Sequence, residues 1–99
     1  HAHPGALWAA VYYLDMGHGT GPEAEPQGEG GELYFEDPRF PVPQMAFPGF
    51  RALGPDGQPQ PVEHRVPTRP GDLLLFPAYL RHGVRPHSGA RERVAVAMN

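Results

Sequence analysis

Histidines at the two ends of the chain have the type and spacing of metal ligands. His1 and His3 stand two positions apart, and side chains at i and i+2 point to the same side of an extended strand. His82 follows an apolar segment that reads as buried, where a polar side chain is costly unless it has a partner. Three imidazoles can occupy one face of the coordination sphere of a transition metal. The sequence therefore predicts a metal site formed by His1, His3 and His82.

An anion could be held beside that metal by Arg93 and Tyr13. Arg93 opens the apolar segment 93–98, and the two-residue period of a strand places it on a face of alanines. A guanidinium on such a face needs an anionic partner, and its planar fork fits a carboxylate. Tyr13, on the face of segment 7–14 that also carries the small Ala9, adds a hydroxyl donor. One dicarboxylate could therefore reach from the metal to Arg93 and Tyr13.

These histidines also have interpretations that involve no metal. A His-x-His pair is common by chance, and His82 could be a core histidine bonded to a backbone carbonyl. The chain has three further histidines, His18, His64 and His87, in or beside polar loops and without a partner at ligand spacing. We expect these three to be solvated surface residues.

The segments that must position these residues read as strands. They are short, rich in β-branched and aromatic side chains, and separated by turn residues, with no convincing helix among them. This pattern predicts an all-β domain, a barrel or a sandwich. Both faces of segment 7–14 are apolar, so we expect it to be buried on both sides. The six expected strands are 7–14, 32–36, 62–66, 72–76, 82–85 and 93–98.

Two loops interrupt the strands. Residues 15–30 are rich in Gly, Pro and Glu, and residues 38–61 carry seven prolines, which cannot donate to a β-ladder. The second loop also holds large apolar side chains, such as Phe47 and Phe50. Such a loop inside a small domain is either a lid over a binding site or a segment packed on the outside. We therefore expect one domain over residues 1–99, with 38–61 as a lid-like loop.

Composition limits the classes of partner. Ninety-nine residues allow one domain with a modest core. The formal charge of −3 gives no electrostatic basis for binding nucleic acid or a membrane surface. There is no cysteine, so a thiolate metal site is excluded, and no apolar run approaches the length of a membrane span. We expect a cytoplasmic protein, and a chain that is part of a longer one, lacking N-terminal elements.

Read together, these motifs resemble a bacterial family of 2-oxoglutarate- and Fe(II)-dependent oxygenases. The resemblance covers nearly the whole chain except the middle loop, and the order and spacing of the motifs make it specific. The matching segments are His1-Ala2-His3-Pro4, Ala10-Val11-Tyr12-Tyr13-Leu14, Phe35-Glu36-Asp37-Pro38-Arg39, Gly71-Asp72-Leu73-Leu74-Leu75-Phe76-Pro77, His82-Gly83-Val84 and Arg93 through Asn99.

The resemblance implies a double-stranded β-helix, also called a jelly roll, with Fe(II) and 2-oxoglutarate as cofactors and O2 as cosubstrate. It implies that His1 and His82 bind iron and that Arg93, aided by Tyr13, binds the far carboxylate of 2-oxoglutarate. Other members of the wider superfamily carry Asp or Glu where this chain has His3. Either His3 is itself a ligand, or a carboxylate from elsewhere, Asp37 or Asp15, takes its place. We favour His3, because its spacing places it beside His1.

The implied reaction is an oxidation of substrate coupled to decarboxylation of 2-oxoglutarate to succinate and CO2. Two other functions stay open, namely a metal-binding dioxygenase of the cupin type and a non-catalytic jelly-roll binding domain with a decayed iron site. The expected partners are a small-molecule or peptidyl substrate and, as an alternative to a monomer, a second copy of the chain in a homodimer.

Overall fold

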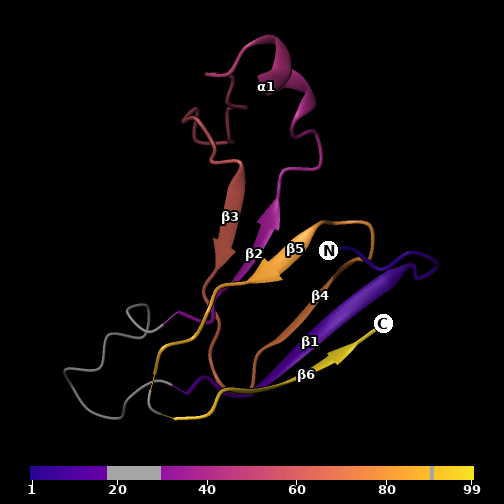
Figure 1. The fold of residues 1–99 in the computed structure, drawn as a ribbon, viewed down its shortest axis with the longest axis vertical. Coiled ribbons are helices and arrows are strands. Elements are labelled where there is room, and N and C mark those ends of the chain that lie inside the picture. The colour runs from indigo at the N-terminus through magenta and orange to yellow at the C-terminus, as the bar shows by residue number, and fades with distance from the viewer. Residues whose placement is uncertain (18–29, 90) are drawn as a thin grey trace.

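The described part of the chain folds into two antiparallel β-sheets and one short helix (Figure 1). The computed structural model describes residues 1–17, 30–89 and 91–99. No helix within these ranges is long and apolar enough to cross a membrane. The elements, in chain order, are β1 (Trp8–Asp15), β2 (Leu33–Glu36), α1 (Val42–Ala46), β3 (Glu63–Val66), β4 (Leu73–Pro77), β5 (His82–Val84) and β6 (Val94–Met98).

The strand order explains how distant segments come together. One sheet has the order β4-β1-β6 and the other the order β3-β2-β5. The all-β class is confirmed, and each of the six predicted strands begins and ends within one residue of its expected limits. The sheets do not close into a barrel within the described residues, because each has three strands and no ladder joins one to the other. Loop 15–30 lies mostly outside the described residues.

The predicted alternation of side chains along β1 is confirmed, but the prediction that both faces of this strand are buried is wrong. Ala9 and Tyr13 are buried, whereas Trp8 and Leu14 on the opposite face are 56% and 50% exposed. On the same outer face, Ala10 and Tyr12 pair with exposed apolar side chains of β4 and β6. No described residue covers this outer face, so its apolar side chains are exposed. The exposed side chains from the neighbouring strands are Leu73, Leu75, Val94, Val96 and Met98.

A small core lies where the two sheets approach each other. Its buried members come from both sheets and from the turn after β4, namely Ala9, Leu33, Phe76 and Ala78. Phe35 from β2 meets Phe76 from β4 edge to face, with ring centres 4.8 Å apart, a favourable arrangement for aromatic pairs. This contact fixes β2 and β5 against β1 and β4.

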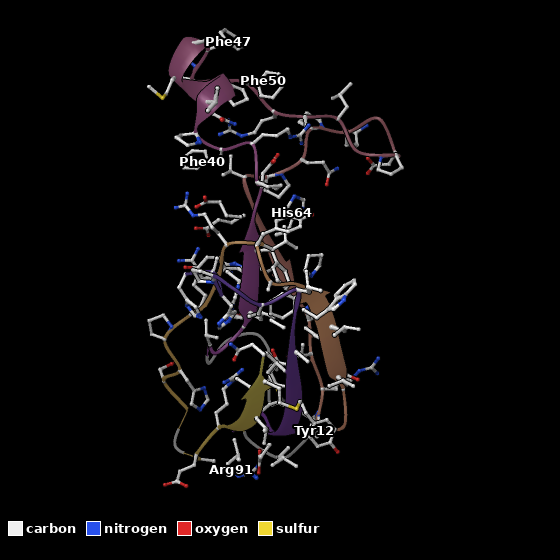
Figure 2. The ribbon with its side chains drawn as sticks, turned by 90° about the vertical axis from the view of Figure 1, so that its right-hand side faces the viewer. Tyr12, Phe40, Phe47, Phe50, His64 and Arg91 are labelled. Carbon is white, nitrogen blue, oxygen red and sulfur yellow. The ribbon has the colours of Figure 1, made fainter. Side chains whose placement is uncertain are left out.

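The segment between β2 and β3 contains a helix that the sequence pattern did not predict. Helix α1 spans a single turn, with Pro43 near its start, where the missing amide hydrogen and fixed φ of proline are tolerated. Figure 2 shows Phe40, Phe47 and Phe50 gathered around this helix, at the end of the molecule opposite Tyr12 and Arg91. Farther along this segment, Pro55 and Asp56 form a turn that is closed by the hydrogen bond from the Gly57 amide to the Gly54 carbonyl, 2.9 Å.

Candidate metal centre and anion pocket

The first residues of the chain connect the two sheets. The His1 backbone nitrogen donates to the His82 carbonyl and the His82 amide donates to the His1 carbonyl, both at 2.9 Å. The His3 amide donates to the Ala78 carbonyl at 3.0 Å. His82 belongs to β5 in one sheet and Ala78 follows β4 in the other. These backbone bonds therefore hold the His-x-His segment over the gap between the sheets.

As a result, three imidazoles converge. Each of His1, His3 and His82 offers a nitrogen, and these atoms all lie within 4.8 Å of one another. The ring centres are 4.5 Å apart for His1 and His82, 5.0 Å for His1 and His3, and 5.1 Å for His3 and His82. Metal–imidazole bonds of about 2.1 Å require nitrogens somewhat closer than this limit, so small turns of the rings complete the face. The donor set fits a borderline transition metal.

The protein fixes the orientation of His82. It is 7% exposed, and its Nδ1 lies 2.8 Å from the Leu80 carbonyl. A carbonyl only accepts, so Nδ1 carries the proton and Nε2 keeps its lone pair for a ligand. Histidines that bind metals are commonly oriented by such a bond. The edge of Phe76 packs on the ring at a centre distance of 4.9 Å.

Neither alternative carboxylate joins the histidines. The Asp37 carboxylate accepts two bonds from the Arg39 guanidinium, at 2.9 and 2.7 Å, and this partner lowers the pKa of Asp37 to about 2. The Asp15 carboxylate accepts a bond from Arg91 at 2.6 Å. Among the described residues, the group of converging ligands contains three histidines and no carboxylate. The arrangement therefore favours His3 over Asp37 and Asp15 as the third ligand.

A cavity of about 220 Å³ joins the histidines to the predicted anion-binding residues. The three imidazoles stand in its wall together with Tyr13 and Arg93. It is smaller than a pocket for a drug-sized ligand, so it suits a small acid. None of residues 38–61 lines it, and that segment extends beyond the ends of β2 and β3 (Figure 1). The loop does not cover the cavity in this structure, so its closing as a lid stays a prediction.

Tyr13 and Arg93 both present polar atoms that lack partners. The Tyr13 hydroxyl and the Arg93 Nε are buried and have no hydrogen bond of normal geometry among the described residues. Burial raises the pKa of Tyr13, and the nearby Arg93 charge and Thr68 hydroxyl only oppose this rise. The Arg93 guanidinium carbon lies 5.3 Å from the centre of the Tyr13 ring. Buried polar groups without partners are costly, so these atoms fit the carboxylate of a ligand.

The prediction that the other three histidines are solvated has a different outcome for each. His64 is exposed on β3, as predicted (Figure 2), and His18 lies outside the described residues. His87 is half-buried, and its Nε2 lies 3.0 Å from the Arg91 carbonyl. The prediction of a solvated His87 is therefore wrong, because the chain folds this ring against the segment that leads to Arg93. No signal in the local sequence pattern indicates that contact.

Comparison with known proteins agrees with the geometry. No curated protein matches the chain. The model of the family described as "Putative 2OG-Fe(II) oxygenase" matches residues 1–99, the whole sequence. With this match over its full length, the chain belongs to the 2OG-Fe(II) oxygenase family.

Proposed function

We propose that this chain is the catalytic part of a 2-oxoglutarate-dependent oxygenase in which His1, His3 and His82 hold Fe(II). One observation carries the proposal. Three imidazoles meet in the wall of a cavity that Tyr13 and Arg93 also line, and among the described residues the Tyr13 hydroxyl and the Arg93 Nε have no hydrogen bond of normal geometry. A ligand with two carboxylates would satisfy both groups of donors. The overall fold we propose is the double-stranded β-helix, and a match to the family supports it.

In the proposed complex, each protein group has a defined role. The oxo-acid end of 2-oxoglutarate would share the metal with the imidazoles, and bound Fe(II) would supply the chemistry that activates O2. Arg93 would form a charge-assisted pair with the far carboxylate. Tyr13 would donate a hydrogen bond to the same carboxylate, because its raised pKa keeps the hydroxyl protonated. The apolar walls of the cavity, Leu33, Phe76 and Val84 among them, would exclude water.

The histidine in place of a carboxylate has an electrostatic consequence. Three neutral imidazoles add no negative charge to a divalent metal, so the bound dicarboxylate is the main counter-charge of the site. Metal and 2-oxoglutarate should therefore bind cooperatively, each raising the affinity of the other by the same factor. An all-nitrogen face also accepts Zn, Ni or Cu.

The proposal is tested by incubating the purified protein with Fe(II), O2 and 2-oxoglutarate and measuring succinate and CO2. Each turnover consumes one O2 and one 2-oxoglutarate and yields one succinate and one CO2, with the second oxygen atom passing to the substrate. When ascorbate replaces the substrate as the two-electron reductant, so that the second oxygen atom leaves as water, slow succinate formation is expected, and it should be lost in Arg93→Ala. Absence of both turnover and 2-oxoglutarate binding would contradict the proposal.

Within the described residues the ligand group contains no carboxylate, which favours one alternative, a non-catalytic domain that binds metal and dicarboxylate without turnover. Binding of 2-oxoglutarate with no succinate formed, under any metal, would support it. A cupin-type dioxygenase is less well supported, because it leaves Arg93 and Tyr13 without a role. Oxidation of a substrate without 2-oxoglutarate would support that alternative instead.

A further inference from the structure

Gly31 lies directly against the side chain of Arg93. It precedes β2, is buried, and has a φ of +85°. A Cβ added at Gly31 would lie 2.9 Å from the Arg93 Cδ and 3.1 Å from its Nε, closer than side chains normally approach. Arg93 lines the cavity and Gly31 does not. The stem of Arg93 therefore occupies space that a side chain at position 31 would take.

The surroundings leave Arg93 little room to move sideways. A Cβ added at Gly31 would also lie 3.5 Å from the His87 Nδ1, so the His87 ring is a second neighbour of that position. His87 is in turn held by its 3.0 Å contact with the Arg91 carbonyl. Behind this ring stands Gly17, whose own added Cβ would come within 2.6 Å of the His87 Nε2 and 3.1 Å of the Arg93 amide nitrogen. A methyl group at position 31 would therefore push Arg93 toward the cavity.

We propose that Gly31 is a specificity-determining residue that sets the length of the dicarboxylate the cavity accepts. This inference rests on the proposed function, in which Arg93 holds the carboxylate far from the metal. With glycine at position 31, the Arg93 guanidinium lies far enough from the three histidines to leave room for 2-oxoglutarate. With alanine, the guanidinium moves toward the histidines and shortens the space between them. The affinity for a long diacid then falls more than the affinity for a short one.

The test compares Gly31→Ala with a matched control, Gly71→Ala. Gly71 has a φ of +92°, and nothing lies within 4 Å of its added Cβ. Both variants force an alanine into the left-handed region, but only the first meets Arg93. Dissociation constants are measured by calorimetry on Ni(II)-loaded protein for 2-oxoglutarate and for oxaloacetate, which is one methylene shorter. This readout does not depend on turnover.

We expect Gly31→Ala to weaken 2-oxoglutarate binding at least about fivefold, as overpacking of this size does, and to weaken oxaloacetate binding less. The Gly71→Ala protein should bind both acids like the wild type. Adding His87→Ala to Gly31→Ala should restore part of the affinity by giving Arg93 room to move aside.

The outcomes separate this inference from the proposed function. If the wild type binds 2-oxoglutarate and Arg93→Ala loses it, but Gly31→Ala behaves like Gly71→Ala, the inference is wrong and the function stands. Equal weakening of both acids by Gly31→Ala also overturns it. If Gly31→Ala alone does not fold, the double variant with His87→Ala carries the test. Its preference should still shift part of the way toward the shorter acid, and a preference identical to that of the His87→Ala single variant refutes the inference. A wild type that binds neither acid contradicts the proposed function itself.

Discussion

Replacing Tyr13 by phenylalanine should have opposite effects on stability and on ligand binding. Tyr13 is fully buried, and its hydroxyl has no hydrogen bond of normal geometry among the described residues. Leaving such a group buried without a partner costs about 1–3 kcal/mol. Phenylalanine keeps the ring and removes the hydroxyl. The variant without ligand should therefore be as stable as the wild type or more stable, by up to that amount.

In the complex with 2-oxoglutarate the same hydroxyl would gain a charged acceptor. A hydrogen bond to a charged group contributes about 1.5–3 kcal/mol, so Tyr13→Phe should weaken 2-oxoglutarate binding about 10- to 150-fold. Because burial raises the pKa of Tyr13, the hydroxyl stays protonated at neutral pH. The loss of affinity should therefore be constant between about pH 6 and 9, well below the ordinary tyrosine pKa of about 10.

Urea unfolding without ligand and calorimetric titration with 2-oxoglutarate measure the two effects. A Tyr13→Phe protein destabilised by more than about 1 kcal/mol, the usual net value of a hydrogen bond, would show that the hydroxyl is already satisfied in the free protein. Unchanged affinity would remove Tyr13 from the proposed anion pocket. Either result would refute the inference that the Tyr13 hydroxyl gains its hydrogen-bond partner from the bound carboxylate.

Three further predictions concern the metal, the acid response and the exposed sheet face. His82→Ala should abolish binding of Ni(II) or Fe(II), measured as metal content after dialysis, whereas His64→Ala should bind metal like the wild type; equal metal in the two variants would contradict the ligand assignment. Asp37 has a pKa lowered to about 2, so its pairing with Arg39 stabilises the fold above the unfolded pKa of about 3.9 and is lost as the pH falls toward about 2; Asp37→Asn should flatten the acid-unfolding curve in that window, and an unchanged curve would argue against the pairing. Leu75, 65% exposed on the outer face of β4, should tolerate serine with a change within about 0.5 kcal/mol, whereas Leu33→Ala, at 1% exposure, should cost about 2–5 kcal/mol; a large cost at Leu75 in urea unfolding would show that this face is covered in solution.

Residue types and the two-residue period of extended backbone were enough to predict several side chains of the site. The i, i+2 spacing of His1 and His3, the alternation in β1 and the position of Arg93 just before β6 agree with the cavity that these residues and Tyr13 line together. The period of two does this without any knowledge of neighbouring elements, because it is a property of a single strand.

Features that depend on contacts between distant segments could not be predicted in this way. His87 reads as a loop residue, yet its ring packs against Gly17, where an added Cβ would come within 2.6 Å of its Nε2. The apolar side chains of loop 38–61 predict a lid, but its composition does not determine the direction in which it leaves β2, so its closing over the cavity stays a prediction. The apolar outer face of β1 predicted burial, and a pattern alone does not supply the element that would cover it.

The central claim, that three histidines hold the metal while Arg93 and Tyr13 hold the far carboxylate, is tested most directly by crystallography. Crystals grown with Ni(II) and 2-oxoglutarate would give an anomalous difference map at the metal edge. We predict one strong peak at about 2.1 Å from a nitrogen of each of His1, His3 and His82, with no side-chain carboxylate bound. The far carboxylate should contact Arg93 and the Tyr13 hydroxyl. A metal held by Asp37 or Asp15, or a diacid bound away from Arg93, would contradict the account.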